Sequence, residues 1–349
     1  MEISKSKALE AALLALEEEE QGNENADALI NIYYSSWPLE ESEGNPKEDL
    51  IHLGEDAFDD PDYLQEILDT RFQDYPKPLS KEDYRKNPYY ALLKKVDETE
   101  GKWSLRWLRY GPKEILPYQE KIVFPALHFR ELTPIGYFEE EFPYPALLEG
   151  EEIWMSIIPH EIETMASSIE EAKGKVLVYG LGLGYFAYMA AEKEEVASVT
   201  IIEKDEELVA WFLDAVLPLF PHKEKVKIIQ GDALGHHCKK GEYDFLFADL
   251  WHEARDGYPL YKRLLKAHHP IPVQRFWIEG EILAFLRRYL IVYLVDAYFE
   301  GERNEVGSDE DSKMFRAIQK GLKEVKISSP KDLENLLSDG GLKALIQKI

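Results

Sequence analysis

The sequence of 349 residues contains a single cysteine, Cys238, and far fewer basic than acidic residues. One cysteine excludes an internal disulfide framework and a zinc site built from cysteines, and it favours a reducing compartment. The 41 Lys and Arg residues stand against 67 Asp and Glu, which gives a formal net charge of −26. Such a field repels phosphate backbones, so we expect no nucleic-acid partner. It favours cationic small molecules or basic proteins instead.

Long apolar runs are also missing. Residues 1–20 form an acidic helical pattern with neither a basic start nor an apolar stretch, which does not fit a signal peptide. The most apolar late segment, residues 282–299, carries two arginines and an aspartate, and it is too short and too charged to span a bilayer. We therefore expect no membrane partner and a cytoplasmic location.

The chain nevertheless has enough apolar residues for a sizeable core, because they make up 45% of the sequence. Its patterns predict a helical region over 1–100, a small β-rich region over 101–158, an α/β domain over 159–300 and a helical extension over 301–349. The first helix is expected to end near Gly22 and Asn23, which are helix-breaking residues. The aromatic residues of the N-terminal region would suit a homodimer interface.

Strands and helices alternate regularly after residue 158. Alternating βαβ units imply a mostly parallel, doubly wound sheet that is covered on both faces, and the unbroken β-branched runs of the strands fit that class. No glycine-led hairpin follows the last strand, so we expect a short sheet. The predicted strands are 176–179, 198–203, 226–230, 245–249 and 275–278, and the predicted helices are 159–169, 185–192, 206–217 and 258–267.

The sharpest motif is a glycine trio, Gly180, Gly182 and Gly184, placed between a predicted strand and a predicted helix. Glycines allow a sharp strand-to-helix turn and let the backbone approach a ligand closely. The next strand ends at Glu203, about 20 residues on, where a carboxylate can accept both ribose hydroxyls of a nucleoside.

Polar residues also follow the third and fourth strands, at Asp232-Ala233 and at Asp249. Because open α/β sheets bind ligands at the carboxyl ends of their strands, all of these residues are expected at one site.

These residues resemble the class I S-adenosylmethionine-dependent methyltransferases, a Rossmann-like family, over roughly residues 160–280. The resemblance implies that the glycine loop holds the methionine part of S-adenosylmethionine. It implies that Glu203 holds the ribose, that Asp232 and Ala233 hold the adenine, and that Asp249 lies beside the transferred group. The family usually has an acid two residues before the first glycine, whereas this sequence has Val178.

Two alternatives to S-adenosylmethionine as the cofactor remain open. A NAD-binding loop prefers a small residue at the position of Tyr185, so NAD fits less well. The layout is similar to that of the spermidine synthases, in which a Tyr-His-Glu motif precedes the cofactor domain, as Pro159-His160-Glu161 does here. The acids that those enzymes carry in the glycine loop and after the fourth strand are replaced by Leu183 and His252.

Asp249 and His252 are the candidate catalytic residues. A histidine in the loop after the fourth strand can act as a general base, although it can equally be a solvated residue before the next helix. Trp251 is either a lid or a packing residue. His160 and Glu161 either line the pocket or begin a helix. We expect no metal site, because adjacent residues such as His236 and His237 point apart on regular elements.

The sequence thus predicts an S-adenosylmethionine-dependent methyltransferase whose acceptor is a small molecule. One alternative is a spermidine-synthase-like aminopropyltransferase that uses the decarboxylated cofactor. The other is a degenerate domain that binds a nucleoside or serves as a scaffold without catalysis, which Val178 keeps open.

Overall fold

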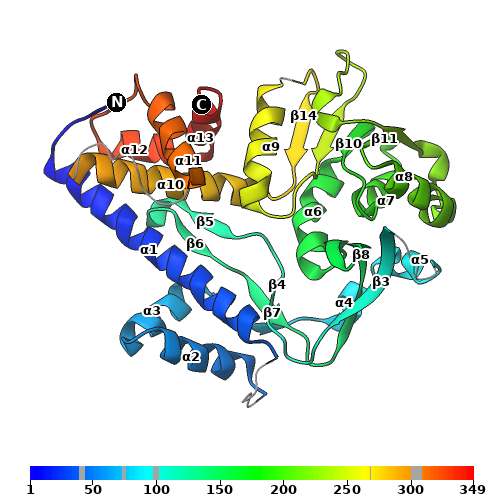
Figure 1. The fold of residues 1–349 in the computed structure, drawn as a ribbon, viewed down its shortest axis with the longest axis horizontal. Coiled ribbons are helices and arrows are strands. Elements are labelled where there is room, and N and C mark those ends of the chain that lie inside the picture. Colours follow the sequence, from blue (N-terminus) through cyan, green and yellow to red (C-terminus); the bar gives the residue numbers. More distant parts are fainter. Residues whose placement is uncertain (39–43, 73–75, 97–101, 268, 300–308) are drawn as a thin grey trace. The chain divides into compact units, whose positions relative to one another are not determined.

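The computed structural model describes residues 1–38, 44–72, 76–96, 102–267, 269–299 and 309–349. They form two compact units, and each unit combines segments that are far apart in the sequence (Figure 1). Unit 1 comprises Met1–Tyr75, Lys121–Pro134 and Gly280–Ile349, whereas unit 2 comprises Pro76–Glu120 and Ile135–Glu279. The boundaries predicted after residues 100 and 300 fall outside the described ranges, and the predicted division into domains stays a prediction.

A parallel sheet forms the centre of unit 2 and confirms the predicted Rossmann-like α/β class. Within the described residues it has five strands in the order β12-β11-β10-β13-β14, so the expectation of a short sheet is confirmed. The strands are β10 (Gly174–Tyr179), β11 (Val196–Glu203), β12 (Val226–Gln230), β13 (Phe245–Ala248) and β14 (Val273–Phe276).

The two central strands are buried throughout their apolar runs, as a sheet covered on both faces requires. The four residues of β13 and the last four of β10 are each at most 3% exposed. The helices that connect the strands are α7 (Tyr185–Ala191), α8 (Glu206–Trp211) and α9 (Ala254–Lys266), and the right-handed crossovers usual for parallel strands would put α7 and α8 on one face and α9 on the other. The strand order reverses beside β10, and the loops at the carboxyl ends of the strands meet there.

Two helix boundaries differ from the prediction for local reasons. Helix α9 begins at Ala254, four residues earlier than expected, because Glu253 and Asp256 form a capping box. The regular part of α8 ends at Trp211, and the chain continues as a π-helical turn over Phe212–Val216 before Pro218.

The remaining elements of unit 2 precede the parallel sheet. An antiparallel sheet pairs β3 (Trp103–Tyr110), β8 (Phe142–Glu149) and β9 (Glu152–Ser156), and α6 (Pro159–Glu171) leads from it into β10. The others are β2 (Lys77–Pro78), α4 (Lys81–Arg85), α5 (Pro88–Leu93), β4 (Leu116–Pro117) and β7 (Ile135–Tyr137).

Unit 1 brings both chain ends together, because β1 (Glu2–Ile3) pairs with β15 (Lys326–Ile327) (Figure 1). None of the described helices has the length and hydropathy that crossing a bilayer requires. The further elements are α1 (Lys7–Ser36), α2 (Pro46–Ala57), α3 (Pro61–Arg71), β5 (Ile122–Phe124), β6 (Arg130–Leu132), α10 (Glu279–Phe299), α11 (Asp309–Gly321), α12 (Pro330–Leu337) and α13 (Asp339–Ile346).

The predicted end of the first helix is wrong, because α1 continues through Gly22 and Asn23 to Ser36. Tertiary contacts use both residues inside the helix. The guanidinium of Arg71 packs on Gly22, where a Cβ would lie 2.2 Å from Nη2. The buried Asn23 amide accepts from Arg71 Nε at 3.1 Å and from the backbone N–H of Glu131 at 2.9 Å. Packing therefore overrides the helix-breaking preference of the two residues.

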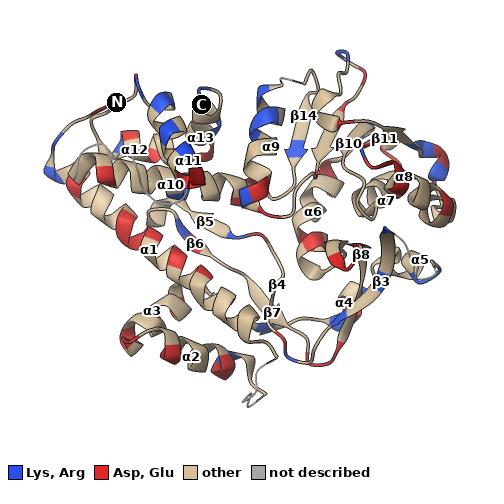
Figure 2. Ribbon diagram, in the orientation of Figure 1, with Lys and Arg blue, Asp and Glu red and all other residues tan. Residues whose placement is uncertain are grey.

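Acidic residues lie along α1, α2 and α3 (Figure 2), and one of those on α1, Glu20, is buried beside Arg288. Arg288 of α10 binds Asp27 at 2.8 Å and also pairs with Glu131, so three chain segments meet in one charge network. Glu20 is 4% exposed, and its Oε1 lies 3.7 Å from Arg288 Nε. Burial raises the pKa of the Glu20 carboxyl to about 8; the Glu131 charge adds to the rise and Arg288 opposes it.

Glu20→Gln is therefore expected to stabilise the protein at alkaline pH. The folded state holds the Glu20 proton more tightly than the unfolded state does, so stability falls as the pH rises from about 4.5 to about 8. Glutamine cannot ionise, so the free energy of unfolding of the variant should exceed that of the wild type by an amount that grows over this pH range to a few kcal/mol. Urea unfolding at pH 5, 7 and 8.5 measures it. Glu17→Gln, on the exposed face of α1, should show no such trend, and a pH-independent difference for Glu20→Gln would contradict the expectation.

Candidate functional site

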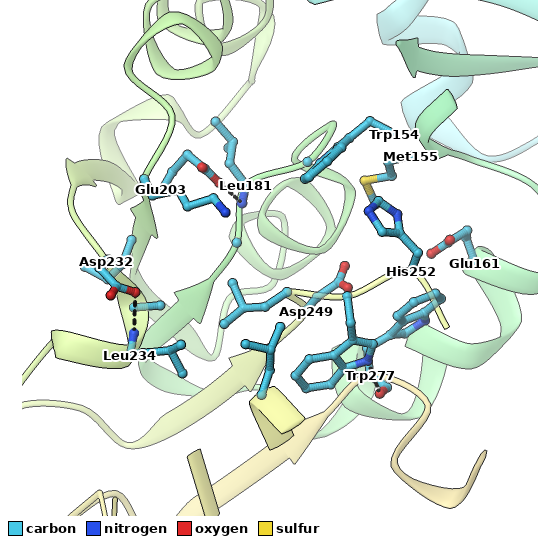
Figure 3. A pocket seen from close by; sticks show the side chains of 18 of the residues that line it. Trp154, Met155, Glu161, Leu181, Glu203, Asp232, Leu234, Asp249, His252 and Trp277 are labelled. Atoms are coloured by element: carbon cyan, nitrogen blue, oxygen red, sulfur yellow. Dashed lines mark hydrogen bonds between the residues drawn. The ribbon is translucent and has the colours of Figure 1, made fainter. Parts of the chain in front are cut away.

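A cavity of about 320 Å³ opens at the carboxyl ends of the parallel strands, and its lining residues all belong to unit 2 (Figure 3). Its size is at the small end of the range usual for small-molecule sites. It is bordered by most of the residues that the sequence nominates, which are Gly180, Gly182, Glu203, Asp232, Ala233, Asp249 and His252. The exception is Gly184, which is not among the described lining residues.

The glycine loop forms one side of the cavity, and tight contacts explain its glycines. Gly180 has a φ of +93°, and a Cβ there would lie 2.0 Å from the backbone oxygen of Asp249. Gly182 has a φ of +49°, and its Cβ would lie 2.2 Å from the sulfur of Met155. Gly184 caps α7 with a φ of +77° and packs on Phe212, so its role here is to close the turn.

Glu203 ends β11 and is 9% exposed. Its carboxylate accepts the backbone N–H of Leu181 at 3.0 Å and that of Asp205 at 2.8 Å, which ties the glycine loop to the start of α8. A carboxylate has about four acceptor positions, so two remain for hydroxyl groups of a ligand in the cavity.

Asp232 follows β12 and caps a short 3₁₀ turn over Ala233–Gly235. One of its oxygens, Oδ1, accepts the backbone N–H of Leu234 at 2.9 Å. The second oxygen is not used by that cap, so Asp232 can present an acceptor to the cavity next to the small, buried Ala233.

Asp249 directly follows β13, and Glu161 reaches the same space from the first turn of α6 (Figure 3). Burial raises the pKa of the Asp249 carboxyl, and burial together with the Asp249 charge raises the pKa of Glu161 well above its usual range. The pair therefore retains a proton at pH values where isolated carboxylates would both be charged. His160, the other residue considered on α6, is not among the described lining residues and lies edge-on to Trp277.

His252 is exposed, lines the cavity and sits in the turn before α9. Its ring lies edge-on to Trp154, with the centroids 4.6 Å apart. Its backbone N–H donates to Asp256 at 3.1 Å, as part of the start of α9. His252 thus combines the two positions that the sequence suggests for it, because its backbone helps to begin a helix and its side chain borders the cavity.

Sequence reasoning missed the wall that β9 supplies. Trp154 and Met155 line the cavity, and the Met155 sulfur lies 3.1 Å from the backbone nitrogen of Leu183, within reach of that N–H. Strand β9 belongs to the antiparallel sheet, and no local motif indicates that it meets the glycine loop. The one available signal was the apolar run of residues 153–155 at the end of the predicted β-rich region.

Trp251 and Trp277 form an apolar floor. Each is 5% exposed, and each indole N–H has a partner: Trp251 Nε1 donates to the Trp277 carbonyl at 3.1 Å, and Trp277 Nε1 donates to Thr164 Oγ1 at 2.9 Å. With the N–H groups engaged, the rings contribute apolar surface to the cavity. Trp251 is therefore a packing residue that also borders the site.

The residues around the cavity fit a nucleoside-type cofactor at one end. Such a group needs hydrogen-bond acceptors and a close approach of the backbone. Glu203 and Asp232 supply the acceptors, and the glycine loop, where side chains would clash, supplies the close approach. Val178 is buried inside β10 at 3% exposure, so no acid stands at that position. Among the described residues, no three His, Cys, Asp or Glu side chains are grouped so that they could hold a metal ion.

Comparison with known proteins gives little further information. No protein-family model matches the chain, and no curated protein sequence matches it. A solved structure described as PigF with SAH is similar over 30% of this chain and 36% of its own chain, with 18% sequence identity and a TM-score of 0.24. The similarity thus spans about a third of that chain, and it is too low to carry an inference about function.

Proposed function

We propose that this chain is an S-adenosylmethionine-dependent methyltransferase that acts on a small-molecule acceptor. One observation carries the proposal: the carboxyl ends of β10, β11, β12 and β13 bring Gly182, Glu203, Asp232 and Asp249 around a single cavity. This is the arrangement that the resemblance to class I methyltransferases implies. The size of the cavity suits a small acceptor better than a macromolecular one.

Each residue has a definite task in this proposal. Glu203 would accept the ribose hydroxyls, and Asp232 would accept the adenine amino group beside Ala233. The glycine loop would lie against the methionine part, and Asp249 and His252 would face the acceptor. The cofactor supplies an activated methyl group when bound. The chain itself positions the acceptor and excludes water with Trp154 and Trp277.

One observation favours the aminopropyl alternative. Among the described lining residues the only Lys or Arg is Lys204, which directly follows Glu203 at the proposed ribose end. No lysine or arginine in that set accompanies the glycine loop, where it could pair with the carboxylate of S-adenosylmethionine. A decarboxylated cofactor would need no such partner, so it belongs in the first binding experiment.

Calorimetric titration tests the proposal. Wild-type protein is expected to bind S-adenosylmethionine and its demethylated product with micromolar affinity. Glu203→Gln should weaken both at least tenfold, because it replaces a charged acceptor of hydroxyl hydrogen bonds. Glutamine keeps one oxygen for the N–H groups of Leu181 or Asp205, so the variant tests the ligand contact more cleanly than alanine would.

The matched control is Glu206→Gln, an exposed residue in the first turn of α8 that does not line the cavity. It should bind like the wild type. Tighter binding of the decarboxylated cofactor would support aminopropyl transfer. If none of these ligands binds, the methyltransferase proposal fails and the scaffold alternative gains. If NAD binds instead, the methyltransferase proposal fails in favour of a NAD-binding domain.

A further inference from the structure

The carboxylates of Glu161 and Asp249 line the cavity with no partner among the described residues. Within the described part of the chain, neither carboxylate accepts a hydrogen bond or pairs with a basic side chain. The other acids of the cavity, Glu203 and Asp232, accept backbone N–H groups. Figure 3 shows the side chains of Glu161, Asp249 and His252 directed into the same space. Two acids from different elements, α6 and the end of β13, thus converge on a ligand cavity.

This arrangement is costly unless something positive enters the cavity. Glu161 and Asp249 are half-buried, and two nearby carboxylates that are partly shielded from water repel one another when both are charged; in the free protein a retained proton relieves the repulsion. A cation placed between them reverses the balance, because it attracts both carboxylates and offers hydrogen bonds to their free oxygens. The net charge of −26 draws cations toward the molecule in addition.

The walls of the cavity favour an organic cation over a metal ion. In the part of the chain that the structure describes, no third acid, histidine or cysteine completes a metal-binding group with this pair. Three indole rings border the same cavity instead, those of Trp154, Trp251 and Trp277. Tryptophan faces bind ammonium groups through cation–π attraction, and they cover apolar carbon skeletons as well.

We propose that Glu161 and Asp249 bind the ammonium group of an amine acceptor, so that Glu161 determines the substrate class of this site. As a statement about the acceptor, this inference rests on the proposed function. The ammonium N–H groups donate to both carboxylates, and the proton that the pair retained is released to solvent on binding. The amine becomes nucleophilic when one N–H proton moves to the Asp249 carboxylate and leaves its electron pair on nitrogen.

Proton release distinguishes this role from a structural one. Two samples are titrated, one of protein without cofactor and one of protein saturated with the demethylated product. Each is titrated with 2-phenylethylamine and with its neutral counterpart 2-phenylethanol. Each titration is run at pH 6.5 in two buffers that differ in ionisation enthalpy. The amine is expected to bind at least tenfold more tightly than the alcohol and to release a substantial fraction of one proton. Its affinity should rise from pH 5 to pH 8.

Glu161→Gln should weaken amine binding at least tenfold at pH 8, abolish the proton release and flatten the pH dependence. Asp249→Asn should act in the same direction. Glu163→Gln is the matched control, because Glu163 lies on the same helix and binds the Tyr84 hydroxyl at 3.2 Å without lining the cavity. It should behave like the wild type, and thermal unfolding of each variant confirms that it is folded.

Three outcomes would overturn the inference. The amine and the alcohol could bind equally, Glu161→Gln could leave amine binding unchanged, or that variant could weaken the binding of S-adenosylmethionine alone. The last would assign the pair to the cofactor. If S-adenosylmethionine binds and the amine does not, the inference fails and the proposed function stands. If the amine binds with proton release and no cofactor binds, the amine site stands and the proposed function fails.

Discussion

Gly180→Ala is expected to lower the free energy of unfolding by about 2 to 6 kcal/mol and to abolish cofactor binding. The added Cβ would lie 2.0 Å from the backbone oxygen of Asp249, at a residue whose φ is +93°. Neither the end of β10 nor the end of β13 can yield without breaking the sheet, because Gly180 N–H donates to the Ile202 carbonyl and Asp249 N–H to the Tyr179 carbonyl. Thermal unfolding and calorimetric titration with S-adenosylmethionine measure the two effects.

Gly241→Ala is the matched control for this substitution. Gly241 has a similar φ of +80°, but nothing lies within 4 Å of the position that its Cβ would take. Gly241→Ala is therefore expected to lower the free energy of unfolding by about 1 to 3 kcal/mol, the cost of the backbone conformation, and to leave cofactor binding intact. Equal loss of stability in the two variants would show that the close approach of Gly180 to Asp249 does not exist in the folded protein.

Arg288→Met is expected to lower the free energy of unfolding at pH 7 by about 3 to 5 kcal/mol. The guanidinium binds Asp27 at 2.8 Å and Glu131 through two N–H groups, and it faces Glu20 at 3.7 Å. Burial by itself would raise the pKa of Asp27, but Lys121 and Arg288 outweigh burial and hold it below its usual range. Removal of the arginine leaves these carboxylates with too little compensating charge, since Lys121 still pairs with Asp27 and Glu131 but Arg287, which also attracts Glu131 and Glu20, pairs with Asp339 instead.

The deficit of Arg288→Met should shrink as the pH falls. Arg288 lowers the pKa values of Asp27 and Glu20, so both pKa values rise in the variant. The variant therefore loses stability as the pH increases above the usual range of a carboxyl, whereas at lower pH the two carboxyls are neutral and need no cation. Urea unfolding at pH 4.5, 6 and 7.5 measures the trend. Arg316→Met removes an exposed arginine of α11 and should change stability little. A deficit independent of pH would mean that the arginine acts through packing alone.

Local pattern predicted much of unit 2. Every strand of the parallel sheet and the helices between them lie where the alternation of apolar runs places them, within a few residues. The cavity borders Gly180, Gly182, Glu203, Asp232 and Asp249 because parallel strands put their carboxyl ends at one edge of the sheet. That rule follows from connectivity, so it can be read from a sequence. The differences have local causes: a capping box starts α9 early, and a π-helical turn before Pro218 ends the regular part of α8 early.

Contacts between distant segments could not be predicted in this way. Helix α1 continues through Gly22 and Asn23 because Arg71 and Glu131 need the space and the amide that these residues offer. These contacts with Arg71 and Glu131 explain why the helix continues where the sequence predicts its end. Unit 1 likewise joins three separate segments through Arg288, and nothing local to any one segment marks the pairing.

Hydrophobic periodicity and glycine conformation are local properties, so the α/β class, the order of strands and helices in the second half and the residues at the strand ends could be predicted from the sequence. Three placements emerge only in the folded chain: β9 covers the glycine loop with Met155, Glu161 lies near Asp249, and Gly184 faces Phe212. Those placements depend on how separate sheets and helices pack, and packing is set by shape and burial over the whole unit. The cavity wall formed by Trp154 and Met155 therefore becomes evident only in the folded chain.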